Sequence, residues 1–133
     1  MKLGLLTAAF PDTPLTEVAD WAAANGFSVL EVACWPRGEG AARRYAGVSH
    51  IDVAALSDGE AKELVEDLAG RGIQISGLGY YPNPLHPDPG VRSEALAHLR
   101  VLIAGAARMG VPVVNTFVGA DATRPLAENI QAA

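Results

Sequence analysis

Three segments of the chain repeat one pattern, in which a glycine follows a stretch with helical spacing and precedes a short apolar, β-branched run. The segments cover residues 26–30, 72–76 and 110–114. Glycine is the usual residue just past a helix, because it enters the left-handed conformation without a Cβ clash. The pattern therefore predicts a helix, a stop and a strand, three times. The three glycines are 46 and 38 residues apart, which is enough for a strand, a loop, a helix and a loop.

The strands predicted by this pattern cover residues 2–9, 28–35, 74–80 and 112–118. They are mostly continuous apolar runs, which favours a parallel sheet buried on both faces. Strands that alternate with helices imply right-handed βαβ units. We therefore predict an α/β fold, with a (β/α)-type parallel sheet of about four βα units, in a single domain over residues 1–133.

Helix starts are visible in the sequence as well. Thr13 is a candidate cap for the first helix, residues 57–60 form a capping box before the second, and Asp88 precedes the third. The apolar face predicted for the third helix comprises Ala95, Leu99, Leu102, Ile103 and Ala106. A fourth helix begins near Pro125, and neither a glycine stop nor a basic last turn follows it. We expect the chain to be truncated within this fourth helix.

Composition excludes several classes of protein. Hydrophobic residues make up 50% and charged residues 19% of the 133 residues, which excludes a disordered chain. The net charge of -5 and the lack of a basic stripe argue against a nucleic-acid partner. No apolar run approaches the roughly 18 to 20 residues that a membrane span needs. Cys34 is the one cysteine, so no internal disulfide is possible, which fits a cytoplasmic protein.

Aromatic residues gather where the predicted strands end. Five of the eight aromatic residues lie there, namely Phe10, Trp35, Tyr80, Tyr81 and Phe117. The carboxyl ends of parallel strands are where ligands bind in α/β folds, and aromatic faces suit the C–H faces of sugars. Any one of these rings could equally seal loops against the sheet. Taken together, they favour a pocket.

Glu31 is the only carboxylate inside a predicted strand. It shares a face with Trp35, because the two positions differ by an even number. A buried carboxylate needs a partner, since its pKa otherwise rises. Glu31 could act as a base, or support a metal ligand, or equally play a structural role by pairing with an arginine such as Arg37.

Two loops carry further polar candidates. The loop over residues 80–89 has four prolines in eight residues, so it is stiff, and Asn83 and His86 could bind hydroxyls or phosphate oxygens. Asn115 could add one inward polar group from the fourth strand. The loop over residues 36–56 is long enough to be a lid. Its basic residues, which could grip an anion or lie in solvent, are Arg37, Arg43, Arg44 and His50.

The segments at residues 2–5, 27–32, 72–85 and 113–119 give the chain a family resemblance. It resembles the N-terminal half of the sugar phosphate isomerase/epimerase family, whose fold is the xylose isomerase-like TIM barrel. The most specific part is residues 78–85, and the similarity covers essentially the whole chain. The resemblance implies half of a TIM barrel, since a complete barrel has eight strands.

The resemblance also implies an activity and a cofactor. Such enzymes isomerise or epimerise a sugar or polyol through an enediol-type proton transfer, with a divalent metal (Mn, Mg, Zn or Co). The family's usual metal ligands follow the fifth to eighth strands, so the resemblance places none in this chain, which we expect to be inactive alone. The substrate-binding residues that we predict are Phe10, Glu31, Trp35, Tyr81, Asn83, His86 and Asn115.

Other readings stay open. The chain could be a half-barrel that pairs with itself or with the missing half-barrel, because four parallel strands leave two open edges and one uncovered face. It could also be a small α/β binding module without catalysis. A branch of the same fold comprises abasic-site endonucleases, with zinc-binding histidines near the third and fourth strands. Residues 78–80 and 117–119 contain no histidine, and the acidic charge disfavours DNA.

Overall fold

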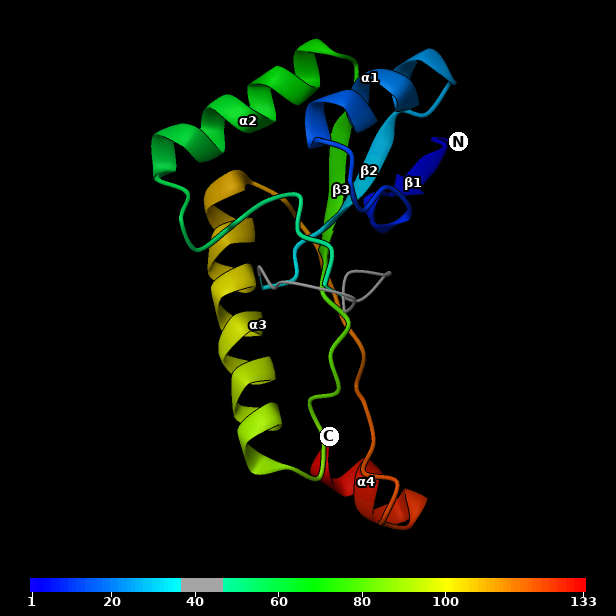
Figure 1. Cartoon of the computed structure of the whole chain (residues 1–133), viewed down its shortest axis with the longest axis vertical. Coiled ribbons are helices and arrows are strands. Elements are labelled where there is room, and N and C mark those ends of the chain that lie inside the picture. The colour runs from blue at the N-terminus through cyan, green and yellow to red at the C-terminus, as the bar shows by residue number, and fades with distance from the viewer. Residues whose placement is uncertain (37–46) are drawn as a thin grey trace.

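A computed structural model describes residues 1–36 and 47–133, and four parallel strands form one sheet in the order β1-β2-β3-β4. The strands are β1 (Gly4–Leu6), β2 (Val29–Ala33), β3 (Gln74–Gly79) and β4 (Val114–Asn115). A 3-10 turn, η1 (Thr7–Ala9), follows β1. The helices are α1 (Leu15–Ala24), α2 (Asp58–Gly70), α3 (Pro89–Met109) and α4 (Leu126–Ala132). The predicted α/β fold of four strands alternating with helices is confirmed (Figure 1).

The observed strands are shorter than the apolar runs that predicted them. At β1 the chain turns into η1, where the Thr7 hydroxyl accepts a hydrogen bond of 2.9 Å from the Ala33 amide. At β4 only two positions are in register with β3, which pairs Leu78 with Val114 and Gly79 with Asn115. The apolar runs are longer than the strands, because residues near a strand end can pack their apolar side chains while their backbone pairs with no neighbouring strand.

The main core lies between one face of the sheet and the helices. Leu30, Val32 and Leu78 are fully buried on that face, against α1, α2 and α3. The other face is open, since Leu6 is 39% exposed and Glu31 is only half-buried. The expectation of a sheet buried on both faces is therefore wrong for this chain. In a closed barrel this inner face is covered by the strands opposite, and four strands leave it uncovered.

The helix starts follow the sequence signals at two of three places. Ser57 and Glu60 form a reciprocal capping box at α2, and the Asp88 carboxylate accepts from two backbone amides at the start of α3. The predicted cap at Thr13 is wrong, because Pro14 occupies that position and makes no side-chain cap. Ile103 is also misassigned to the buried face of α3, as it is 59% exposed.

The helices are distributed along the length of the molecule. In Figure 1, α1 and α2 lie together at one end, α4 lies at the other, and α3 runs between them. Arg71, directly after α2, pairs with Asp67 of α2 and Asp20 of α1, which joins these two helices. Among the residues described, no helix is both long and apolar enough to cross a bilayer.

Candidate functional site

A pocket of about 410 Å³ lies on the open inner face, at the carboxyl ends of the strands. Two of the predicted site residues, Trp35 and Tyr81, form part of its wall, and Phe117 from the segment after β4 forms another part. One leucine and three small residues make up the remainder. The lining residues are Leu6, Ala8, Ala33, Trp35, Gly79, Tyr81 and Phe117. All of them are uncharged, so the wall is apolar apart from the Tyr81 hydroxyl and the indole N–H.

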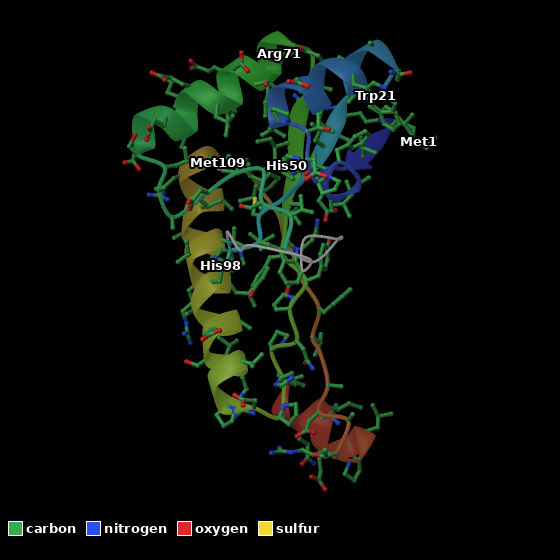
Figure 2. All side chains as sticks on the ribbon, in the orientation of Figure 1. Met1, Trp21, His50, Arg71, His98 and Met109 are labelled. Carbon is green, nitrogen blue, oxygen red and sulfur yellow. The ribbon has the colours of Figure 1, made fainter. Side chains whose placement is uncertain are left out.

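Aromatic contacts hold the pocket wall in place. The rings of Tyr81 and Phe117 are 4.9 Å apart and tilted by 50°. Trp35 meets Tyr80 edge to face at 4.8 Å. Tyr80 itself turns away toward α3, where it contacts His98 at 4.6 Å. His98, labelled on α3 in Figure 2, also binds the Cys34 carbonyl oxygen through Nε2 at 2.7 Å. The Tyr80–His98 pair therefore supports the pocket wall from behind.

Glu31 brings a negative group to the same face of the sheet. The Tyr81 hydroxyl donates a hydrogen bond to Glu31 Oε1. Glu31 also lines a smaller hollow of about 200 Å³, which shares Leu6 with the aromatic pocket. Burial, together with the bond to Glu31, raises the pKa of Tyr81, so this phenol stays protonated and keeps donating at neutral pH. The arginine considered as a partner, Arg37, lies outside the described residues.

Two glycines of β3 make room for these polar side chains. A Cβ at Gly79 would lie 2.7 Å from Glu31 Oε1 and 3.2 Å from the Tyr81 ring. A Cβ at Gly77 would lie 3.0 Å from the Asn115 side-chain nitrogen. Contacts under 3.0 Å force a neighbour to move, so any side chain at position 79 would displace Glu31. Alternate glycines on β3 therefore form the floor on which Glu31 and Asn115 lie.

The remaining predicted residues do not line the aromatic pocket. Phe10 packs on Trp21 of α1 with ring centroids 5.3 Å apart. The Asn83 side chain accepts from the Leu85 and Ala120 amides and donates to the Ala120 carbonyl at 2.8 Å. His86 Nδ1 accepts from the amide of Asp88 at 3.1 Å. Asn83 thus ties its proline-rich loop to the segment after β4, and His86 bonds within the loop.

Sequence reasoning placed Phe117 at this edge but did not count it among the binding residues, and it missed the small lining residues. Ala33 and Gly79 line the pocket because they sit at alternate positions with Glu31 and Gly77 along β2 and β3. Because side chains at alternate strand positions share one face, the sequence could have indicated these two residues as part of the same face as Glu31. The arginines of the predicted lid, Arg37, Arg43 and Arg44, lie outside the described residues.

A larger hollow of about 530 Å³ lies elsewhere, between α2 and the segment that precedes it. It is bordered by His50, Asp52, Glu60, Glu63 and Asp67, among others. Glu60 is already engaged in the α2 capping box. Because this hollow is lined by α2 rather than by strand ends, it is not the candidate site.

The described residues do not fit a divalent metal. No group of three or more His, Cys, Asp or Glu side chains within residues 1–36 and 47–133 is arranged to hold one. On the inner face, Glu31 is the single carboxylate of β2, and it is already bonded to Tyr81. We therefore assign no metal-dependent step to these residues.

Comparison with solved structures gives matches over part of a larger fold. A D-psicose 3-epimerase structure matches with a TM-score of 0.65 and 18% identity, over 98% of this chain and 44% of that chain. A putative xylose isomerase from Rhodospirillum rubrum matches with a TM-score of 0.65 and 18% identity, over 98% and 45%. The probable 3-DHS dehydratase AsbF from Bacillus anthracis matches with a TM-score of 0.60 and 16% identity, over 88% and 38%. At these identities the likeness shows the fold.

The chain spans under half the length of these structures. Its four parallel strands correspond to half of the eight strands of a complete TIM barrel. No curated protein matches the chain. A family model described as xylose isomerase-like TIM barrel matches residues 19–133, which is most of the sequence. The chain therefore belongs to the xylose isomerase-like TIM barrel family.

Proposed function

We propose that this chain forms the N-terminal wall of the substrate site in a metal-dependent sugar or polyol isomerase or epimerase. The observation that carries the proposal is the aromatic pocket at the strand ends, with Glu31 and Tyr81 bonded beside it. The metal ligands and the groups that move the proton through an enediol-type intermediate then come from outside this chain. The neighbouring folds are those of an epimerase, a putative isomerase and a probable dehydratase.

The pocket suits the carbon skeleton of a sugar. Trp35, Tyr81 and Phe117 present aromatic rings around a volume of about 410 Å³, and small-molecule sites of this kind are concave and mostly apolar. Gly79 has no side chain and Ala33 only a methyl group, so a ligand can lie directly on the sheet and present its C–H groups to the rings. The wall binds and orients the ligand and keeps water from it.

Ligand binding to the purified chain tests this proposal. D-Fructose, present in the epimerase structure, is the probe, and saturation transfer from protein to sugar C–H protons is measured by NMR. We expect transfer from the unmodified chain and a two- to tenfold weaker interaction in Phe117→Ala, since an aromatic contact contributes about 0.5–1.5 kcal/mol. Val118→Ala is the matched control, because Val118 is similarly exposed, at 66% against 59% for Phe117, but does not line the pocket.

The result that contradicts the proposal is equally defined. If D-fructose and other neutral polyols receive no saturation at millimolar concentration, the pocket is not a sugar site. Equal losses in Phe117→Ala and Val118→Ala would also exclude the assigned wall. A separate carbon-13 assay follows conversion of the sugar with Mn²⁺, Mg²⁺, Zn²⁺ or Co²⁺ present. We expect no turnover by the 133-residue chain alone, and turnover would show that the chain carries its own catalytic groups.

A further inference from the structure

We propose that the Glu31–Tyr81 pair selects a neutral, hydroxyl-bearing part of the ligand, by accepting hydrogen bonds from two neighbouring hydroxyl groups, and that it excludes a phosphate from this wall. The inference rests on the proposed function, which supplies a polyol as the ligand. The inference goes beyond that function by stating which part of the substrate faces these four strands. The observation behind it is the placement of Glu31 between the aromatic pocket and the smaller hollow, with Leu6 shared by both.

The chemistry of the pair determines what it can bind. Tyr81 uses its one hydroxyl hydrogen on Glu31 Oε1, so toward a ligand the phenol oxygen can only accept. An ionised carboxylate likewise only accepts. Within the described chain, Tyr81 is the only polar partner of Glu31 that the geometry shows, which leaves Oε2 available. Two adjacent acceptors match two adjacent hydroxyl donors.

The surroundings of the pair disfavour an anion. Every residue that lines the aromatic pocket is uncharged, and Glu31 contributes the only charge beside it among the described residues. A phosphate ester there would face a carboxylate with no cation among residues 1–36 and 47–133 beside it to offset the charge, and like charges in a partly desolvated site repel strongly. The described wall therefore suits the unphosphorylated portion of a sugar.

The backbone is adapted to hold this pair. Glu31 lies against Gly79, where a Cβ would come within 2.7 Å of its Oε1. The carboxylate can approach the phenol in this way only because position 79 has no side chain. Tyr81, two residues further along, is kept in place by Phe117 at 4.9 Å. The pair is thus positioned by β3 and by the segment after β4.

The test compares a neutral sugar with a doubly phosphorylated, anionic analogue. D-Fructose and D-fructose 1,6-bisphosphate are titrated by NMR against the unmodified chain, Glu31→Gln, Tyr81→Phe and Glu17→Gln. The bisphosphate is chosen because either of its ends would bring a phosphate to the wall. Glu17→Gln removes one negative charge from α1, which contributes no residue to the lining of either hollow, and so controls for net charge.

We expect the unmodified chain to bind fructose at least tenfold more tightly than the bisphosphate. Glu31→Gln should weaken fructose binding about tenfold, because a charged hydrogen bond is lost. It should also reduce the difference in affinity between fructose and the bisphosphate. Tyr81→Phe should weaken fructose binding several-fold, because the carboxylate is no longer held. Glu17→Gln should leave both affinities, and the ratio between them, within twofold of the values for the unmodified chain.

Failure of this inference is distinct from failure of the proposed function. Suppose that fructose binds and that Phe117→Ala weakens its binding, whereas Glu31→Gln and Tyr81→Phe do not. The Glu31–Tyr81 pair is then not a binding group, but the aromatic pocket remains the sugar site. An equal loss for both ligands in Glu31→Gln, with a lowered melting temperature, would show a structural role only and would overturn the selectivity. If fructose does not bind the unmodified chain, both proposals fall.

Discussion

Cys34 directly follows β2 and is only 1% exposed. Burial raises the pKa of its thiol to about 12, although a bond from the Ile51 backbone partly opposes this. The thiolate is the reactive form, so burial suppresses both access and ionisation.

The first prediction is therefore that Cys34 resists modification in the folded protein. An aromatic disulfide reagent at mildly alkaline pH should react slowly with the native chain and at once in denaturant. Since the chain has one cysteine, the absorbance change reports Cys34 alone. Complete reaction of the native chain within minutes would contradict its burial.

His50 provides a pH dependence of stability. Its Nε2 lies 3.1 Å from the carbonyl oxygens of both Phe10 and Thr13, so Nε2 carries the proton. Its Nδ1 is buried and has no partner among the described residues. Burial lowers the pKa of His50 from its usual 6.5, and the two carbonyls only partly offset this. The folded state therefore keeps His50 neutral where the unfolded chain already takes up a proton.

Proton uptake by His50 in the unfolded chain makes the protein less stable at acidic pH. Above pH 6.5 both states are neutral at His50, and stability is fully present. As the pH falls below 6.5 toward the lower folded pKa, the unfolded state binds more protons, so the free energy of unfolding decreases. His50→Gln keeps an N–H donor but does not titrate, so its urea-unfolding free energy should vary less over this range. Identical pH profiles for the two proteins would contradict the assignment.

Single residues of the site were predictable only in part. The even spacing of Glu31 and Trp35 correctly placed both on the inner face. The partner of Glu31 was not predictable, because Tyr81 is 50 residues away and no local pattern links them. Asn83 looked like a free binding group in sequence. Its bonds to Ala120 depend on how two distant loops meet, which only the folded chain shows.

At the scale of elements, α3 packs closely on the segment before α2. Gly105 is buried in α3, and a Cβ there would lie 1.9 Å from Val53 Cγ1. Arg108, one turn further along, donates to the Val53 carbonyl oxygen at 2.9 Å. The helix can lie this close to Val53 because position 105 has no side chain.

We therefore predict opposite effects of alanine at two helical glycines. Gly105→Ala should lower the free energy of unfolding by about 1–3 kcal/mol through overpacking, despite the better helix propensity of alanine. Gly59→Ala in α2 is the control, because a Cβ there meets nothing within 4 Å, and it should stabilise by up to about 1 kcal/mol. Urea unfolding measures both changes.

A second variant makes the cause testable. Val53→Ala removes the side chain that the new Cβ would strike, so Gly105→Ala should cost less in the Val53→Ala background. Additive effects in this double-mutant cycle would show that the contact is not responsible.

Helices were easier to predict than strands, for a physical reason. The starts of α2 and α3 are encoded by side chains that bond to nearby backbone amides, so the signal is local. Strand limits depend on which residues find a partner across the sheet. β4 reduces to Val114–Asn115 because only these positions pair with β3. The apolar run over residues 112–118 could not reveal that limit.

For the whole molecule, the sheet has two edges and one open face. β1 and β4 each have a single neighbouring strand in the described sheet. Apolar side chains are exposed near both edges, including Leu3, Val113 and Phe117. Unpaired strand edges beside apolar side chains promote association between chains.

We accordingly expect the purified chain to self-associate. Light scattering should give an average mass above 13.8 kDa that rises with concentration. Val113→Lys, beside β4, should lower that mass, because a lysine at an edge opposes strand pairing. Ile130→Lys on α4 changes an exposed apolar residue away from the sheet and should have little effect. A constant monomer mass at all concentrations would contradict the expectation.

The strand order β1-β2-β3-β4 also bears on how the chain is made. Each strand pairs with the one synthesised just before it, so every newly emerged strand finds its neighbour already outside the ribosome. The nascent chain never has to keep a strand unpaired while it waits for a much later one. Folding can therefore keep pace with translation, unit by unit, from the N-terminus.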